Sequence, residues 1–117
     1  MHIASLINNV ANVQTEHVVN NTLGEDAVFT KNADSEQFWA IGRIDWSYSN
    51  ATAGGKLTVA YAGSTVWEID IVAAGPGHVE FKFPDFLHND FTKNQQLVVT
   101  LHHGGGNATK KLNVRYC

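Results

Sequence analysis

The sequence predicts an all-β protein: a single antiparallel β-sandwich of jelly-roll or Ig-like type, with an N-terminal arm. Three observations favour this fold class. From residue 37 onward, apolar and polar residues alternate with a period of two, as expected for strands with one buried face. Short turns rich in Gly, Asn and Pro separate these stretches. The length of 117 residues suits one domain with one core.

Six strands are expected in the second part of the chain. They cover residues 37–48, 56–61, 65–71, 79–83, 96–101 and 111–116. In the first of them, the even-numbered Phe38, Ala40, Ile44, Trp46 and Tyr48 are expected to face the core. The intervening polar side chains are expected to face water, so this strand has one face on each side of a sheet.

The best-defined local structure is a hairpin that joins the second and third expected strands. Gly63-Ser64 predicts a type II′ turn between them. On the return strand, alternation places Trp67, Ile69 and Ile71 inward. Residues 73–77, Ala-Ala-Gly-Pro-Gly, then predict a tight bend, because proline fixes φ and glycine tolerates unusual dihedral angles.

The first 36 residues differ in pattern and are assigned to an N-terminal arm with the first strand or strands, before a sandwich core over residues 37–117. Ile3, Leu6, Ile7 and Val10 recur at helical spacing, but neighbouring asparagines disfavour a helix. Residues 18–29 could supply one or two strands. Two alternatives stay open: an arm lying on a neighbouring subunit, or a first strand and loop of the same sandwich.

Charge is scarce and unevenly distributed. Only 16% of residues are charged, against about 25% in ordinary domains. Residues 1–15 and 95–109 contain no Asp, Glu, Lys or Arg, which makes these two neutral patches the expected partner contacts. The net charge of -3 and the scattered cations argue against nucleic-acid binding.

Membrane and disulfide classes are also disfavoured. No apolar run approaches the roughly 18 residues of a membrane span, and the N-terminus does not resemble a signal peptide. The single cysteine, Cys117, cannot form an internal disulfide or a cysteine-based zinc site. As a nucleophile it is disfavoured, because a frayed terminus cannot orient it.

Catalytic and metal-binding constellations are weak, so we expect neither an enzyme nor a cofactor. His102 and His103 are adjacent on a strand and should point to opposite faces. A loop combines Asp85, His88 and Asp90, which is also ordinary for a solvated loop. Glu68 and Asp70 share a strand face that alternation places toward water. No nucleophile elbow or phosphate loop occurs.

The aromatic residues support an alternative function, a carbohydrate-binding (lectin-like) module or a phage adhesin component. Three Trp and three Tyr are present, and exposed aromatic rings can stack on sugars. Trp46 and Trp67 fall on the side assigned to the core. Trp39 lies on the opposite side beside Ile41, so Trp39 is the best candidate for an exposed contact.

The strand-and-turn pattern is carried by residues 44–49, 54–59, 66–71, 74–77, 97–101 and 111–116. With this pattern, residues 41–116 resemble small virion structural proteins of tailed bacteriophages and prophages, of the capsid decoration or cement type. The resemblance implies a homotrimer on the outside of the capsid, made in the host cytoplasm, that binds the major capsid protein and stabilises the shell. It implies no catalytic residues and no nucleic-acid or membrane partner.

Six side chains are the candidate contacts with such a partner. The N-terminal apolar residues Ile3, Leu6, Ile7 and Val10 are the first choice, because they lie in an uncharged segment. Trp39 and Ile41 are secondary candidates. Deletion of residues 1–13 is expected to abolish capsid binding and to leave a folded β domain.

Overall fold

The computed structural model describes residues 13–50, 54–82, 86–105 and 109–117, and these form an all-β fold. Strands arise where apolar and polar residues alternate, because this pattern buries one side and solvates the other. The eight strands within these residues are β1 (Gln14–Asn20), β2 (Ala27–Lys31), β3 (Ile41–Tyr48), β4 (Gly55–Tyr61), β5 (Ser64–Ile71), β6 (Gly75–Glu80), β7 (Leu97–Leu101) and β8 (Lys110–Tyr116). In these ranges no helix is long and apolar enough to cross a membrane.

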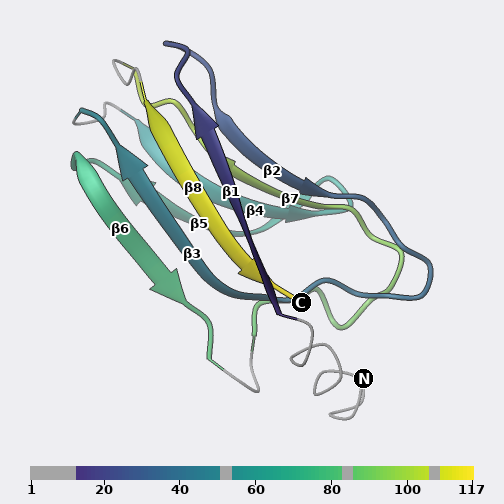
Figure 1. The fold of residues 1–117 in the computed structure, drawn as a ribbon. Coiled ribbons are helices and arrows are strands. Elements are labelled where there is room, and N and C mark those ends of the chain that lie inside the picture. Colours follow the sequence, from purple (N-terminus) through teal and green to yellow (C-terminus); the bar gives the residue numbers. More distant parts are fainter. Residues whose placement is uncertain (1–12, 51–53, 83–85, 106–108) are drawn as a thin grey trace.

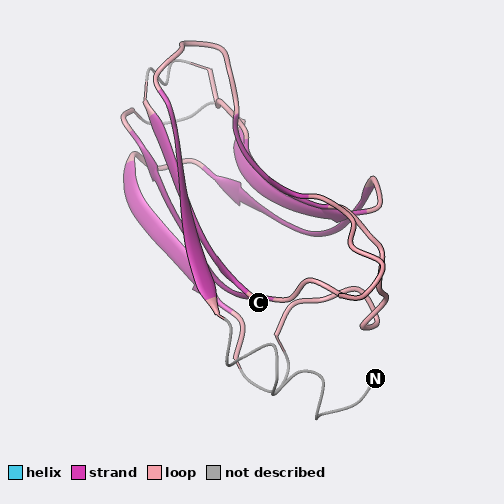
Figure 2. Ribbon diagram, turned by 45° about the vertical axis from the view of Figure 1, so that its right-hand side comes forward, coloured by secondary structure: helices cyan, strands magenta, loops and turns pink. Residues whose placement is uncertain are grey.

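The strands form two four-stranded antiparallel sheets that pack as a sandwich (Figures 1 and 2). Sheet A has the order β1-β8-β3-β6, and sheet B has the order β2-β7-β4-β5. Only β4 and β5 are consecutive neighbours in one sheet, so all other connections cross between the sheets. Eight strands connected in this way form a jelly roll, whereas an Ig-like domain has a different order. The predicted sandwich is confirmed, and its type is the jelly roll.

The core lies between the sheets and follows the alternation. On β4 and β8 every second residue is buried. Phe29, Ile44 and Leu101 come from three different strands and are at most 1% exposed, and full burial of such a side chain stabilises the fold by about 1.5–3 kcal/mol. Ile71 is buried as predicted, but Ile69 is 41% exposed because β5 is an edge strand of sheet B.

The hairpin between β4 and β5 differs from the predicted type II′ turn at Gly63-Ser64. Tyr61 pairs with Ser64, so the two-residue loop is Ala62-Gly63. Both loop residues have positive φ, 51° and 85°, which is characteristic of a type I′ turn. The loop sits one residue earlier than predicted because the buried Tyr61 side chain, 2% exposed, fixes the register of β4.

The predicted bend over residues 73–77 is shorter than expected: the chain bends at Ala73 and Ala74, and Gly75, with a positive φ of 84°, already begins strand β6. Pro76 is tolerated there since β6 is an edge strand that pairs only with β3, and one side of its backbone needs no partner. Gly77 lies opposite Trp46. A Cβ at Gly77 would lie 2.6 Å from two carbons of the Trp46 ring, so the indole occupies the space of the missing side chain.

Residues 14–31 belong to the sandwich, since β1 pairs with β8 and β2 pairs with β7. This agrees with the alternative in which the first strands are part of the same fold. Residues 1–12, and with them the predicted arm, lie outside the described residues. The strand predicted from residue 37 begins at Ile41, and the preceding Phe38 and Ala40 form a small second core with Cys117.

Candidate binding surfaces

The outer side of sheet A is a polar surface created by strand register. Residues that oppose each other in an antiparallel pair point to the same side of the sheet. Ile44 and Val114 face the core, so residues one position away on β3 and β8 face outward. The outward residues of β8, β3 and β6, here called face A, are Lys111, Asn113, Arg115, Arg43, Asp45, Ser47, Pro76, His78 and Glu80.

Arg43 and Asp45 organise the middle of face A. Arg43 Nε donates to both Asp45 carboxylate oxygens at 3.1 and 3.0 Å, and a terminal nitrogen donates to Oδ1 at 3.0 Å. The Glu80 carboxylate on β6 lies 3.7 Å from the other terminal nitrogen. The hydrogen bond to Asp45, followed by the charge of that carboxylate, raises the pKa of Arg43. The guanidinium is therefore charged at neutral pH, and the side chains of Arg43 and Asp45 remain about one-third exposed, at 32% and 38%.

Two recesses open along face A. The larger measures about 410 Å³ and is lined by Arg43, Asp45, Trp46, Ser47, Pro76, Gly77, His78, Lys111 and Asn113. The smaller measures about 210 Å³ and is lined by Gly42, Glu80, Phe81, Lys82, Phe86 and Arg115. Their polar lining consists largely of planar groups, namely two guanidinium groups, two carboxylates, an imidazole and an amide. Such groups bind hydroxyl-rich or anionic ligands through hydrogen bonds with fixed geometry.

The outer side of sheet B has a different chemistry. Its central outward residues, here called face B, are Val28, Thr30, Thr58, Ala60, Val98 and Thr100. None of them is charged, and Val28 is 44% exposed. Charged side chains border this face: Lys56 lies outward at the start of β4, opposite Asp70 on the edge strand β5, and Glu68 on β5 is opposite Thr58. Val98 and Thr100 place part of the predicted neutral patch, residues 95–109, in the middle of this face.

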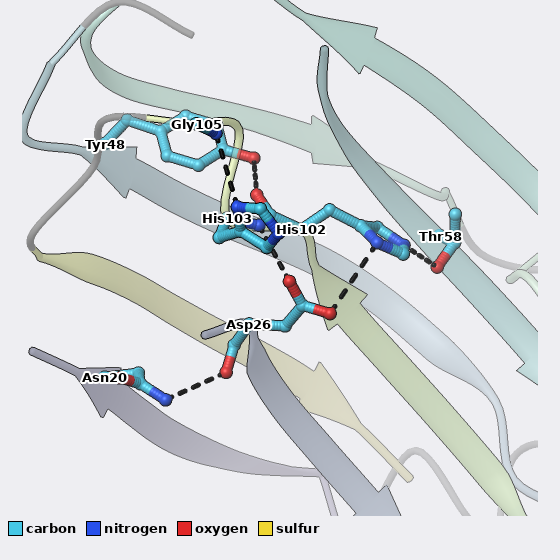
Figure 3. Close-up of polar contacts among 7 residues, drawn as sticks. All are labelled: Asn20, Asp26, Tyr48, Thr58, His102, His103 and Gly105. Carbon is cyan, nitrogen blue, oxygen red and sulfur yellow. Dashed lines mark hydrogen bonds and ion pairs between the residues drawn. The ribbon is translucent and has the colours of Figure 1, made fainter. Parts of the chain in front are cut away.

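A polar cluster at one end of the sandwich binds Asp26, the residue just before β2, to the residues that follow β7 (Figure 3). Asp26 Oδ1 accepts a hydrogen bond from the His103 backbone N–H at 2.8 Å. The other carboxylate oxygen lies 3.8 Å from His102 Nδ1. On its far side, His102 Nε2 is 3.1 Å from Thr58 Oγ1. Asn20 Nδ2 donates to the Asp26 carbonyl at 3.0 Å, which ties the β1–β2 loop to the same cluster.

Two further contacts hold this end together. The Tyr48 hydroxyl donates to the His102 carbonyl, and burial raises the pKa of Tyr48 to about 12. Lys110 is fully buried and donates from Nζ to the Thr22 carbonyl at 2.7 Å. The β1–β2 loop is thus bound to residues that flank β7 and begin β8.

Asp26, His102 and Thr58 stand in the order carboxylate, imidazole, hydroxyl that hydrolases use. The distance of 3.8 Å between Asp26 and His102 exceeds that of a hydrogen bond. Thr58 lies on the outward side of β4, and the two recesses on face A are lined by other residues. Burial lowers the pKa of His102 despite the nearby Asp26 charge, so its imidazole is neutral at pH 7. The contacts of the cluster connect the β1–β2 loop with β4 and with the residues that follow β7.

The predicted contact residues have different environments. Trp39 is partly buried: its Nε1 donates to the Asn32 carbonyl at 3.1 Å, its ring meets Tyr116 edge-on, and Lys31 Nζ lies 5.1 Å from its centroid. Ile41 is 0% exposed, so the expectation that it contacts a partner is corrected. It faces the core because β3 begins there, opposite Tyr116. Ile3, Leu6, Ile7 and Val10 lie outside the described residues.

The predicted metal and carboxylate candidates do not converge on one site. The His102 imidazole lies between Asp26 and Thr58, whereas the His103 imidazole accepts a hydrogen bond from the Gly105 N–H. His88 stacks on Phe91 with centroids 3.6 Å apart. Asp85 lies outside the described residues. Glu68 and Asp70 are exposed, as alternation predicted. Within the described ranges, no group of three or more His, Cys, Asp or Glu side chains could hold a metal ion.

Cys117 is inert for a different reason from the one expected. Its backbone exchanges hydrogen bonds with Ala40 at 2.9 and 3.0 Å, so it is held in place and does not fray. Its side chain is 6% exposed, and burial raises the pKa of the thiol to about 11. The thiolate, which is the nucleophilic form, is therefore scarce at neutral pH.

Sequence reasoning missed both the recesses on face A and the cluster around His102. Alternation does indicate that Arg43, Asp45 and Ser47 point outward together. It does not indicate that His78 and Asn113 flank Asp45, because this depends on pairing between strands far apart in sequence. Asp26, Thr58 and His102 likewise come from three separate strand ends or strands.

No protein-family model matches the chain, and comparison with curated proteins finds no match. Among solved structures, a protein of Bacillus endospore appendages, described as a novel family of disulfide-linked pili, is similar with a TM-score of 0.50 and 10% identity over 89% of this chain and 83% of that one. A family 35 carbohydrate-binding module from Clostridium thermocellum has a TM-score of 0.42 and 10% identity, over 92% of this chain and 93% of its own. At these identities, the similarity concerns the fold alone: this chain has a β-sandwich fold like that of the appendage protein.

Proposed function

We propose that this chain is a non-enzymatic structural protein that binds a larger protein assembly and copies of itself. In its specific form, the proposal is a capsid decoration protein of a tailed bacteriophage. The homotrimer is made in the host cytoplasm, sits on the outside of the capsid, binds the major capsid protein and uses no cofactor. Neither nucleic acid nor membrane is its attachment partner. Many copies on one lattice strengthen attachment through multivalency.

Face B is the observation that carries this proposal. The centre of a protein–protein interface is depleted in charged residues, and the six central residues of face B are uncharged. A surface of small and β-branched side chains loses little side-chain entropy on binding. The appendage protein, which forms pili, supports the view that a β-sandwich of this kind suits a self-assembling structural protein.

The N-terminal residues complement this face. Residues 1–15 are uncharged and include Ile3, Leu6, Ile7 and Val10, so their association with another neutral surface desolvates no charged side chain. In the proposal, this segment provides a second contact with the lattice or a neighbouring subunit. The two contacts together explain why the chain has so few charged residues.

Co-sedimentation with assembled capsids tests the proposal, with bound protein quantified on gels. Thr100→Lys places a charge in the centre of face B and is expected to reduce occupancy at least tenfold. Thr92→Lys makes the same substitution at an exposed loop residue outside face B and should bind normally. Deletion of residues 1–13 should also abolish binding, and light scattering should give a trimer mass. Equal occupancy for Thr100→Lys and Thr92→Lys would count against face B.

A second candidate function, carbohydrate binding, is favoured by the recesses on face A. Asp45, His78 and Asn113 form one row across three strands, and such polar groups pair readily with sugar hydroxyls. The environment of Trp39 gives this function less support, because Lys31 and Tyr116 already contact its ring. A glycan array with the wild-type protein and Trp39→Ala tests this candidate: binding that survives Trp39→Ala points to face A.

A further inference from the structure

Charge is distributed asymmetrically over the molecule. The residues that line the two recesses of face A include four cations, Arg43, Lys82, Lys111 and Arg115, and two carboxylates, Asp45 and Glu80. This leaves a formal charge of +2 there, whereas the whole chain carries -3. The rest of the molecule therefore carries -5. A ligand attracted to face A rather than to the remaining surface is an anion.

The cations are spread along the face and do not converge on one point. Lys111 and Arg115 are both exposed and lie four residues apart on β8, which corresponds to about 13 Å. Lys82 and Arg115 line the smaller recess, and Arg43 and Lys111 line the larger one. This spacing suits a chain with repeated negative charges better than a small anion with one charge.

Between the cations lie groups suited to hydroxyls. Arg43 already donates three hydrogen bonds to the Asp45 carboxylate at 3.0 to 3.1 Å, and Asp45 remains 38% exposed with acceptor capacity left. His78 and Asn113 flank it, and His17 Nδ1 orients the Asn113 amide from β1 at 2.5 Å. A polar row whose Arg43–Asp45 ion pair has no net formal charge, set between the cations Lys111 and Arg115, matches a polysaccharide that alternates hydroxyls with acidic groups.

Nucleic acid is a polyanion too, but face A suits it less well. Binding of single strands relies on aromatic side chains on which bases stack. The outward residues of β8, β3 and β6 include no Phe, Trp or Tyr, and the aromatic residues that line the recesses, Trp46, Phe81 and Phe86, are partly buried and pack against the cores. Asp45 and Glu80 would also oppose a DNA backbone, which carries a negative charge at every nucleotide.

We infer that face A is a binding surface for an anionic polysaccharide. This rests on the second candidate function and goes beyond it by naming the ligand class. In this arrangement the polysaccharide lies along β8. Its carboxylates or sulfates lie beside Lys111 and Arg115, and its hydroxyls lie over Asp45 and Asn113. Attachment through face B is independent of this surface, because the two faces are on opposite sides of the sandwich (Figure 2).

Four immobilised probes test the inference by biolayer interferometry: alginate, which carries carboxylates, dextran sulfate, neutral dextran and a single-stranded DNA oligonucleotide. Alginate or dextran sulfate, or both, should bind at least tenfold more tightly than dextran and DNA. Affinity should fall as salt rises from 50 to 300 mM, because the contacts are exposed ion pairs. The alginate and dextran sulfate arms identify the acidic group.

Charge-reversal variants locate the site. Lys111→Glu and Arg115→Glu are each expected to weaken binding about fivefold, and the double variant more than tenfold. Lys93→Glu makes the same charge change at an exposed loop residue outside face A and should bind like the wild type. Both target side chains point outward, so the fold should persist. Lys111→Gln provides a milder replacement if a reversed charge impairs folding.

Each other outcome overturns the inference in a recognisable way. Tighter binding to neutral dextran than to the acidic probes would exclude an anionic ligand but leave carbohydrate binding standing. No binding to any saccharide, either by biolayer interferometry or on the glycan array, would reject both the anionic polysaccharide and carbohydrate binding in general. Equal binding to DNA would show a nonspecific polyanion surface. Equal losses for Lys93→Glu and Lys111→Glu would show that net charge, and not face A, controls the affinity.

Discussion

Gly77 is the position where a single methyl group should have the largest effect. A Cβ there would lie 2.6 Å from Trp46 Cε2 and Cζ2 and 2.7 Å from Nε1, nearly 1 Å inside ordinary van der Waals contact. Overpacking of this kind costs about 1–3 kcal/mol. Replacing glycine in a strand otherwise gains about 0.5–1 kcal/mol. Gly77→Ala should therefore destabilise the protein by about 1–2 kcal/mol.

Urea unfolding followed by circular dichroism measures this change, and thermal unfolding should show a melting temperature lower by about 4–8 °C. Gly42→Ala is the matched control, because its Cβ would meet Phe86 at 3.8 Å, an ordinary contact. Its stability should stay within about 0.5 kcal/mol of wild type. In a protein that already carries Trp46→Leu, Gly77→Ala should cause much less loss of unfolding free energy than in the wild type, and a double-mutant cycle measures this difference. Equal stability of Gly77→Ala and wild type would refute the role assigned to the indole.

Three other predictions concern the turn, the polar cluster and the cysteine. Ala62 has a φ of 51°, so Ala62→Gly should stabilise the protein by about 0.5–1 kcal/mol in urea unfolding, whereas unchanged or lower stability would contradict the I′ assignment. Burial lowers the pKa of His102 in the folded state, so the unfolded chain binds its proton more readily. The contribution of the neutral His102 side chain to stability is present above pH 6.5 and is lost as pH falls below that value. The unfolding free energy of His102→Gln should therefore depend less on pH between 7.5 and 5 than that of the wild type. Cys117 is 6% exposed, with a thiol pKa raised to about 11, so iodoacetamide at pH 7.5 should label it much faster in urea than in buffer. Rapid labelling of the folded protein would show that the C-terminal residue detaches.

The fold class follows from the sequence because alternation depends only on local residues. Five of the six strands expected after residue 37 are present close to their predicted ranges, as β3, β4, β5, β7 and β8, whereas the one expected over 79–83 lies earlier, as β6 over Gly75–Glu80. β1 and β2 correspond to the strands considered for residues 18–29, with β1 starting earlier. Strand order does not follow, since it depends on contacts between distant segments, such as β1 with β8. The jelly roll and the Ig-like fold share the same local pattern and differ only in these pairings.

Individual contact residues were less predictable than strands, for the same reason. Ile41 and Trp39 look equivalent in an alternating stretch, but β3 starts between them and a register shift follows Ile41. Ile41 is thereby turned into the core, while Trp39 packs against Tyr116. Face A was invisible in the sequence because its row of Asp45, His78 and Asn113 exists only after three strands pair.

The structure shows where the few charged residues of the chain lie relative to the two faces. Face B is neutral at its centre, whereas the recesses of face A carry a formal +2 against -3 for the whole chain. Because the outer sides of the two sheets look in opposite directions, a subunit attached through face B presents face A to the solvent. The two proposals therefore predict that the assembled particle, and not only the free subunit, binds anionic polysaccharide. Particles that carry Lys111→Glu should keep full occupancy and lose this binding, which separates attachment from ligand recognition in one experiment.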